Sequence, residues 1–588
     1  MALSSSEETA PFDGGALVID LDGVLVEQPE EIDPLSLLQG GGPSFAQYRG
    51  RDVIRALTLA AKDDDINSVV LNLDGFMGGG QVLIQDVAEA LNKVKAAKKP
   101  IYAFSSGYFD DSYLLASKAN EIWLDPMGGV LFQGPGGNNL YFKGLLDRFG
   151  VNVRVFRVGK FKSFVEPFTR ENQSDESRLA SQALVDDLWG DWQAKVKAAR
   201  PTANFAAILK DPGAAAEGKG LAELALNTKL VDKLGSEIDF GKHVSKVAGV
   251  GDETIAGDFK GVDFESYLLS NPEDPSGDGV ALITIAGEIV DGEASAGMAG
   301  GDTVARHVTE ALSNDDVKAL VVRIDSPGGS AFASEKMRIA LEEARKKKLP
   351  VIVSMGNLAA SGGYWAAMAG DKIFAEPSTI TGSIGVFSVL PTFENSLSRY
   401  GVKSDGVKTT PLSGQPDLFG GLTPETDRLF QAGVEDIYGK FLGLVSKSRK
   451  LALPRVAEIA EGRVWSGAAA RQLGLVDAFG NLDAAIAEAA KRAKLDAADV
   501  RVIEISDGED FLTWFLGDLG YASLQSPSKG LTGLLVARQQ AYLFAQVRSA
   551  AQVSTSGAVQ ARCMICPITP ATPMLTTVNE NWITGLFR

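Results

Sequence analysis

Two stretches decide the fold: Ser68-Val-Val-Leu-Asn-Leu-Asp-Gly75 and Ala319-Leu-Val-Val-Arg-Ile-Asp-Ser326. Each is a short apolar run that ends at an acidic residue, which is typical of a strand buried on both faces of a parallel sheet. The two stand 251 residues apart, and the segments that precede them, from Arg51 and from Asp302, match at the same offset without a gap. Self-similarity at a fixed spacing indicates a duplicated domain.

The duplication continues beyond these strands. Ile122-Trp-Leu-Asp-Pro126 matches Ile373-Phe-Ala-Glu-Pro377 at the same offset. In both copies apolar strands alternate with amphipathic helices, which predicts right-handed βαβ units and an α/β fold of two tandem domains. We expect a lead-in over 1–14, a first repeat over 15–250, a Gly/Asp/Pro/Ser-rich connector over 251–277, a second repeat over 278–505 and a C-terminal extension over 506–588.

Composition narrows the classes of function. The 588 residues carry a formal net charge of −18, which argues against a surface built for nucleic acid or anionic lipid. No run of 18 apolar residues is present, so no segment is predicted to span a membrane. The start, Met1-Ala-Leu-Ser-Ser-Ser-Glu-Glu8, lacks the basic and apolar regions of a signal peptide and reads as a disordered lead-in or a boundary from which a native anchor was removed.

Metal and cofactor chemistry find no support in the sequence. The two cysteines, Cys563 and Cys566, lie near the C-terminus without a second ligand pair or a βαβ context, so we interpret them as a tail pair that is reduced or locally bonded. No cluster of histidine, cysteine and carboxylate has metal-binding spacing. We therefore expect neither a metal nor a cofactor.

A glycine-rich turn follows the second of the two buried strands. In Asp325-Ser-Pro-Gly-Gly-Ser330, the paired glycines allow a sharp turn that presents free backbone amides. The amides of Gly328 and Gly329 are candidates to bind an oxyanion or a phosphate, although a tight turn without chemistry has the same appearance. The first copy has a looser version, Asp74-Gly-Phe-Met-Gly-Gly-Gly80.

Ser361 is the candidate nucleophile. It lies in Asn357-Leu-Ala-Ala-Ser-Gly-Gly-Tyr-Trp365, between a predicted strand and an apolar helix. Amides at a helix start stabilise negative charge, so the Gly362 amide is a candidate oxyanion donor. The alternative is a serine that only caps the helix.

A serine nucleophile needs a base, and the chain has only two histidines, His243 and His307, neither beside a glycine-rich turn. A Ser-Lys pair is the remaining common arrangement. The candidate is Lys162, in Phe156-Arg-Val-Gly-Lys-Phe-Lys-Ser-Phe-Val-Glu-Pro-Phe168. If this segment is extended, Lys160 and Lys162 lie on one side, with aromatic residues near enough to exclude water and lower the lysine pKa. A solvated lysine in a loop is the alternative.

The two copies differ at these positions. In the repeat register Ser361 corresponds to Asp110, and Lys162 corresponds to Ser413. Each copy therefore lacks one member of the pair, which predicts one composite site per chain.

Taken together, these strings resemble the signal peptide peptidase A family, the long, duplicated form of the S49 serine peptidases, over about residues 15–505. The resemblance rests on the lysine segment Phe156–Phe168, the glycine turn Asp325–Ser330 and the serine motif Ala360-Ser-Gly-Gly-Tyr-Trp365. It rests also on Ile380-Thr-Gly-Ser-Ile-Gly-Val386 and Gly462-Arg-Val-Trp-Ser-Gly467. It implies a Clp/crotonase-like fold, Lys162 as general base and Ser361 as nucleophile. The family's N-terminal membrane anchor is missing here, and Asp325 stands where asparagine is more usual.

The resemblance further implies a homotetramer at the bacterial inner membrane, with the catalytic domain on the periplasmic side, that degrades signal peptide remnants. We expect extended apolar peptides to add to a strand edge over Thr381–Val386 and to contact Thr381, Gly382, Ser383 and Ile384. Nucleic acid is not an expected partner. Two alternatives stay open: a crotonase-like acyl-CoA enzyme, whose oxyanion turns would hold a thioester enolate, and a non-catalytic oligomeric scaffold.

Overall fold

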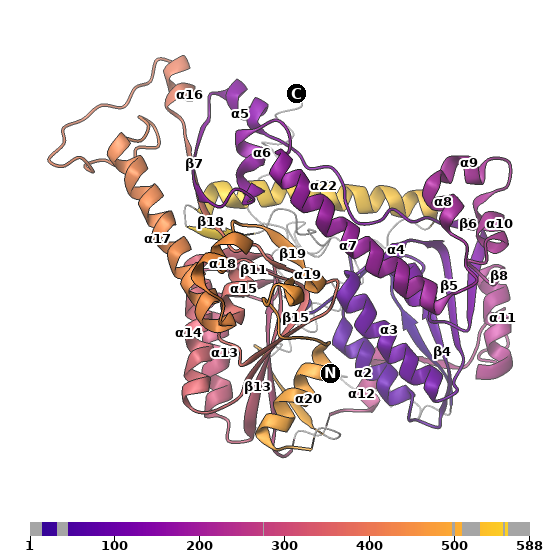
Figure 1. Cartoon of the computed structure of the whole chain (residues 1–588). Helices are drawn as coiled ribbons and strands as arrows, with labels where there is room; N and C mark the ends of the chain where they lie inside the picture. Colours follow the sequence, from indigo (N-terminus) through magenta and orange to yellow (C-terminus); the bar gives the residue numbers. More distant parts are fainter. Residues whose placement is uncertain are drawn as a thin grey trace, which may run out of the picture.

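The computed structural model describes residues 14–31, 45–273, 276–496, 500–507, 530–556 and 559–562. Each repeat forms its own sheet with helices on both faces, and the two halves lie side by side beneath the long helix α22, Leu531–Ser556 (Figure 1). The expected lead-in, apart from Gly14, and the pair Cys563 and Cys566 fall outside the described residues. Within the described part of the chain, every helix is too short or too polar to cross a membrane.

The first sheet is parallel throughout, in the order β8-β6-β5-β4-β1-β9. Its strands are β1 Gly15–Asp20, β4 Ile66–Asn72, β5 Ile101–Tyr108, β6 Glu121–Val130, β8 Lys233–Leu234 and β9 Gly261–Asp263. Its helices are α2 Gly50–Ala60, α3 Gln81–Ala96, α4 Asp110–Ala116, α7 Asp175–Ala199, α8 Ala206–Lys210, α9 Pro212–Ala216, α10 Leu221–Asn227, α11 Glu237–Ala248 and α12 Phe264–Ser270. A separate parallel pair joins β2 Val24–Val26 to β3 Gln47–Arg49.

The second sheet repeats this arrangement in the order β19-β17-β15-β13-β10-β21, with β16 paired to β15 and β20 paired to β16. Its strands are β10 Gly279–Ala286, β13 Val317–Ser326, β15 Val351–Ala360, β16 Lys372–Ala375, β17 Ile380–Gly382, β19 Val464–Ser466, β20 Ala478–Phe479 and β21 Arg501–Ile505. Its helices are α13 Gly301–Ser313, α14 Ala331–Lys346, α15 Gly362–Ala367, α16 Glu394–Arg399, α17 Pro424–Arg449, α18 Leu453–Ile459, α19 Gly467–Gln472 and α20 Leu482–Ala493.

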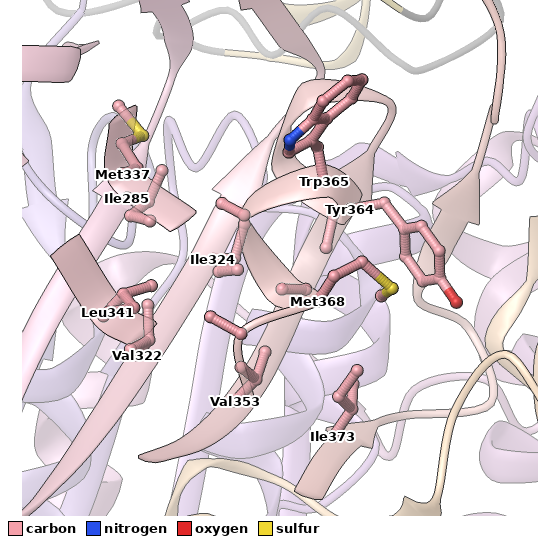
Figure 2. Packing of buried hydrophobic residues seen from close by; sticks show 14 of the residues in the cluster. Ile285, Val322, Ile324, Met337, Leu341, Val353, Tyr364, Trp365, Met368 and Ile373 are labelled. Carbon is pink, nitrogen blue, oxygen red and sulfur yellow. The ribbon is translucent and has the colours of Figure 1, made fainter. Parts of the chain in front are cut away.

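Alternate residues of the central strands enter different cores, as the two-residue period of a strand requires. Val322 and Ile324 of β13 pack on one face against α14 and α15, where Tyr364, Trp365 and Met368 join them (Figure 2). Val321 of β13 packs on the opposite face against α20. Both faces are apolar, which is why these strands read as nearly continuous hydrophobic runs.

The duplication is visible in matched contacts. The hydroxyl of Tyr113 donates to the carbonyl of Leu230 at 2.8 Å, and the hydroxyl of Tyr364 donates to the carbonyl of Leu475 at 2.8 Å. Both tyrosines are buried near the start of the helix that follows the third long strand of their copy. The residues at these helix starts, Asp110 and Ser361, are therefore structural equivalents. The α/β fold and the tandem duplication are confirmed.

Residues 251–277 do more than connect the copies. This segment contributes β9, which pairs with β1, and α12, whose Phe264 and Tyr267 are buried in the first core. The second copy closes its sheet in the same way with β21 beside β10. The sequence did not predict these short elements, because the segment is rich in glycine and aspartate and has few apolar residues.

A third sheet crosses between the copies, in the order β12-β11-β14-β22-β18-β7. Its strands are β7 Asn152–Val158, β11 Glu288–Val290, β12 Met298–Gly300, β14 Gly328–Ser330, β18 Val386–Thr392 and β22 Gln560–Arg562, and its first-copy segment is flanked by α5 Lys143–Phe149, the 3-10 turn η1 Ser163–Val165 and α6 Glu166–Thr169. β7 of the first copy pairs antiparallel with β18 of the second along seven residues. This pairing carries the lysine segment onto the second half of the molecule.

Polar contacts fix the two halves together. The Asn357 amide oxygen accepts from the amides of Val82 and Leu83 at 2.9 and 3.2 Å and so caps helix α3 of the other copy. Arg323 is buried and donates to Glu27 and Asp86, with the Asp86 contact at 3.1 Å. Separating the buried guanidinium from its two carboxylates would cost free energy, because buried charges would be left unpaired. The relative position of the copies is therefore well defined.

Candidate active site

Ser361 lies at the junction of β15 and α15 with φ 55° and ψ −109°, a conformation that is rare for residues other than glycine. Its amide donates to the Gly382 carbonyl at 2.8 Å, which holds the residue in this turn. Its side chain makes no capping hydrogen bond to the helix. The capping alternative is therefore wrong, and the hydroxyl is turned elsewhere.

The hydroxyl is directed to Lys162. The Lys162 Nζ atom is 2.8 Å from Ser361 Oγ, although 199 residues separate the two in the chain. The same amine lies 3.0 Å from Ser383 Oγ and donates to the Ser383 carbonyl at 3.1 Å. Ser361 and Lys162 are 0% and 1% exposed, so these polar atoms meet in a site closed to solvent.

Gly462 is what lets the lysine approach. A methyl group built on Gly462 would lie 2.7 Å from the Lys162 backbone nitrogen, and the Gly462 φ of 77° favours glycine independently. The neighbouring Glu461 carbonyl accepts from the Phe161 amide at 2.9 Å. Sequence reasoning used the Gly462 motif only for the resemblance and missed this positioning role, since no local signal links it to residue 162.

The lysine segment is extended only as far as Val158, so the alternation that would place Lys160 and Lys162 on one side does not hold. β7 ends at Val158, Gly159 turns with φ 106°, and the chain enters η1 directly after Lys162. Lys160 consequently points outward, 61% exposed, and forms an ion pair with Glu461 at 3.0 Å. The turn separates the two lysines, and only Lys162 enters the site.

Burial lowers the pKa of the Lys162 amine well below its ordinary value, because the ammonium form has lost its water. The aromatic residues expected to wall the site are in place. Phe164 and Phe168 are buried, and Phe164 stacks on Phe387 of β18 with ring centroids 5.1 Å apart. The neutral amine is thus favoured more strongly here than in an exposed lysine.

The glycine turn lies directly against the start of α15. A methyl group on Gly362 would be 3.2 Å from Gly328 Cα and 3.2 Å from the Gly329 nitrogen. The Gly328 amide donates to Ser326 Oγ at 3.1 Å, and Gly328 has φ 93°. The three glycines named as oxyanion donors are therefore brought together, with Gly328 already engaged by Ser326.

Asp325 lies at the end of β13, just before this turn. Its carboxylate accepts from the Leu358 amide at 2.8 Å, and burial raises the pKa of this carboxyl above its usual range. It supports the turn through β15 rather than through the reacting atoms.

The expected peptide edge over Thr381–Val386 is wrong. The segment is split at Ser383, which has φ 52°, and its first part, β17, is paired on both sides with β15 and β19. The Thr381 hydroxyl donates to the Ala359 carbonyl at 2.7 Å, the Gly382 carbonyl accepts from Ser361, and Ile384 is buried in the core. These residues support the turn at Ser361, and the neighbouring strands β14 and β18 both pair with β22.

The first copy has filled its corresponding site with carboxylates. The Asp111 carboxylate accepts from the amides of Gly79 and Gly80 at 3.1 and 3.2 Å, at the turn equivalent to the Gly-Gly motif. The Asp110 carboxylate accepts from the Gly134 amide at 3.2 Å, and burial raises its pKa. The donors that would hold an anion here are already occupied by the protein itself.

The remaining sequence candidates lie away from the pair. Ser413 is in the exposed segment between α16 and α17, where its hydroxyl accepts from the amides of Thr409 and Thr410 at 3.2 and 3.0 Å. His307 contacts Asp507 at 3.2 Å, and His243 contacts Glu121 at 3.0 Å. The described residues contain no group of three or more potential metal ligands.

A cavity of about 740 Å³ lies between the copies next to this centre. Its wall includes Phe164, Phe168, Pro327 and Leu358 from around the catalytic turn, and residues of α22 such as Tyr542. The walls are largely apolar, with the first-copy glycine turn at another side. Such a cavity suits the side chains of an apolar peptide.

Comparison with known proteins shows that the protein is a serine peptidase. The chain belongs to peptidase family S49, whose sequence model matches residues 93–251 and 343–496. It is 40% identical over 506 residues to Protease 4 of Salmonella typhi, covering 84% of this chain and 80% of that protein. A protein of Enterococcus faecium, provisionally named signal peptide peptidase SppA, is 32% identical over 203 residues, 35% of this chain and 66% of that one.

Among solved structures, a ClpP1 mutant from Listeria monocytogenes aligns with 35% of this chain and 94% of its own, at 15% identity and a TM-score of 0.24. Membership of a peptidase family decides between the functions that the sequence left open. It favours neither an acyl-CoA enzyme nor a non-catalytic scaffold.

Proposed function

We propose that the protein is an endopeptidase in which Ser361 is the nucleophile and Lys162 the general base. The observation that carries the proposal is the 2.8 Å contact between Lys162 Nζ and Ser361 Oγ in a site from which water is excluded. A neutral amine has two N–H groups and one lone pair. With its N–H groups donated to the Ser383 carbonyl and Ser383 Oγ, its lone pair faces the Ser361 hydroxyl.

In the first step Ser361 Oγ attacks the scissile carbonyl while its proton passes to Lys162 Nζ. The amides of Gly362 and Gly329 stabilise the negative oxygen, and the lysine then gives its proton to the leaving amine. Water hydrolyses the ester in the second step, with the same lysine as base. No metal or cofactor takes part in this sequence.

We further propose that the substrates are cleaved signal peptides and other short apolar peptides. The apolar cavity beside the turn and the name of the Enterococcus faecium relative support this class. Peptides would bind as an added strand along β14, in the position that β22 takes in this structure.

Assembly and location are part of the proposal: a homotetramer held at the bacterial inner membrane by a native anchor, with its catalytic domain on the periplasmic side. A projecting arm supports association of copies (Figure 1). On it, between α16 and α17, Val402, Val407, Leu412 and Phe419 are exposed. Light scattering at micromolar concentration tests the assembly, and a monomer would contradict it.

The catalytic assignment is tested with a serine-directed fluorophosphonate probe and peptide mapping. We expect the label on Ser361, and no label in Ser361→Ala or Lys162→Met. Lys160→Met is the matched control, because it removes an exposed amine two residues away. Labelling of a different serine, or normal labelling of Lys162→Met, would overturn the proposal.

A further inference from the structure

A peptide that takes the position of β22 has a defined direction. β22 pairs antiparallel with β14, and its first residue, Gln560, lies opposite Ser330. Its last residue, Arg562, lies opposite Gly328. A substrate strand in this register runs from Ser330 toward Gly328 and continues to Pro327, which lies on the wall of the cavity. Because the oxyanion donors lie at this turn, the residues that follow the scissile bond lead into the cavity.

Arg538 of α22 lies on the wall of the same cavity. It is the only cationic side chain in the lining, as far as the structure describes it. Its guanidinium carbon is 5.1 Å from the centre of the Phe109 ring, and no hydrogen bond engages the guanidinium among the described residues. A guanidinium is a planar donor that binds a carboxylate through two parallel hydrogen bonds. Arg538 therefore has donors available for an anionic ligand.

Helix α22 holds the guanidinium in place. Leu531 and Leu534, one and two turns before it, are 9% and 1% exposed and pack with Phe109 in one apolar cluster. Further along the helix, the Gln546 side chain accepts from the Leu140 amide at 2.7 Å. The arginine is thus fixed over a buried ring of the first copy, and a ligand that binds it pays little for ordering it.

Five carboxylates share the wall, and four of them are already engaged by protein donors. The Asp110 carboxylate accepts from the amides of Gln133 and Gly134, both at 3.2 Å. Burial raises the pKa of this carboxyl despite the nearby charge of Arg538, so it competes less strongly for the arginine. The other three accept from backbone amides or from Arg323, and they are Asp111, Asp325 and Glu27. The fifth carboxylate belongs to Glu288.

We infer that Arg538 binds the free C-terminal carboxylate of the peptide substrate and so sets the cut at a fixed distance from the end of the peptide. The inference rests on the proposed function, since it places the scissile bond at Ser361. An apolar segment inside a longer chain acquires such a carboxylate when hydrolysis releases it. The reaction that supplies the substrate is therefore an earlier peptide-bond cleavage, and the uncut precursor binds more weakly because it lacks the carboxylate.

Two forms of one peptide test the inference. A peptide of alternating leucine and alanine, ending in a carboxylate or in a carboxamide, is incubated with the full chain, and mass spectrometry gives the rates and the cut positions. We expect kcat/KM to be about tenfold higher for the carboxylate form, the factor that a charge-assisted hydrogen bond supplies. The difference should lie in KM, because the contact is the same before and during reaction. Lengthening the peptide at its C-terminus should move the main cut by the same number of residues.

Variants of the arginine locate the effect. Arg538→Gln should lose both the preference and the fixed cut position, while it cleaves the carboxamide form as wild type does. Arg538→Lys keeps the charge without the paired donors, so it should retain a smaller preference. Arg428→Gln is the matched control, because it removes one positive charge from an exposed side chain on α17. It should behave as wild type.

The outcomes separate the two proposals. If wild type cleaves both forms equally, or prefers the carboxamide as an acidic wall alone would favour, the inference is wrong and the proposed function stands. If wild type cleaves neither form, the proposed function fails and the inference falls with it. A preference that survives in Arg538→Gln, or that is lost in Arg428→Gln, would also overturn the inference. So would a main cut that stays at the same bond when the peptide is lengthened.

Discussion

Ser383→Ala is the change that most directly probes how the lysine is held. Ser383 Oγ is 3.0 Å from Lys162 Nζ, and the Ser383 carbonyl, which the substitution keeps, is 3.1 Å away. The amine would lose one of its two N–H acceptors in a site where it is 1% exposed, so water does not replace the lost partner. Serine and alanine both carry a Cβ and meet the same steric restriction at the φ of 52°, so the change is confined to the hydroxyl.

The two protonation states of the lysine should respond differently. A hydrogen bond contributes about 1.5–3 kcal/mol when one group is charged and about 0.5–1.5 kcal/mol when both are neutral. Losing it therefore disfavours the ammonium form by about 1 kcal/mol more than the amine, which lowers the Lys162 pKa by somewhat under one unit. The N–H left unsatisfied also loosens the amine, and a penalty of about 1–2.5 kcal/mol corresponds to a loss of about 5- to 70-fold in kcat/KM.

The assay is the pH profile of kcat/KM on a short apolar peptide. The rising limb should move to lower pH in Ser383→Ala, and its plateau should fall by the factor given above. Thr381→Val is the control, since it removes an equally buried hydroxyl that bonds to the Ala359 carbonyl and not to the lysine. A limb that stays in place with an unchanged plateau, or that moves to higher pH, would refute this account of the lysine.

Three further changes test other parts of the structure. Lys162→Met should abolish turnover yet raise the melting temperature at neutral pH. The gain should shrink as the pH rises toward about 10.4, because below that pH the lysine binds a proton more readily in the unfolded chain than in its buried position. A variant less stable than wild type at pH 7 would contradict this cost of burying the lysine. Arg323→Met leaves Glu27 and Asp86 buried without their cation and should cost about 3–5 kcal/mol in urea unfolding, and a loss below about 1 kcal/mol would show that this cluster does not join the copies. Asp110→Ser in a Ser361→Ala background should give no peptidase activity, since the Asp111 carboxylate still occupies the glycine amides there, and any measurable turnover would disprove that reading of the first copy.

The sequence predicted the fold well because duplication and two-faced apolar strands are local signals. Val69 to Leu71 and Leu320 to Val322 read as buried strands, and they are the central strands of two parallel sheets. The residues alone made Lys162 and Ser361 candidates, because neither histidine adjoins a glycine-rich turn, and the family resemblance then singled out this pair, whose side chains meet at 2.8 Å.

What the sequence did not predict depends on long-range backbone contacts. The turn at Gly159 that separates Lys160 from Lys162 is held by Glu461, about 300 residues later. Strand β22, Gln560–Arg562, which lies between β14 and β18, is only three residues long and has no periodicity from which a strand can be predicted. The expected edge over Thr381–Val386 failed because β19, which covers β17, comes from far along the chain.

The seam between β7 and β18 has a consequence for how this protein can be divided. It joins the halves through seven rows of antiparallel backbone contacts, and side-chain pairs such as Asn357 with α3 add specificity. A chain cut between α12 and β10 would yield two fragments, each with a sheet of its own, with Lys162 on one and Ser361 on the other. Mixed together, they carry everything needed to rebuild one catalytic centre. In this respect the single chain is equivalent to a heterodimer whose two subunits are joined covalently.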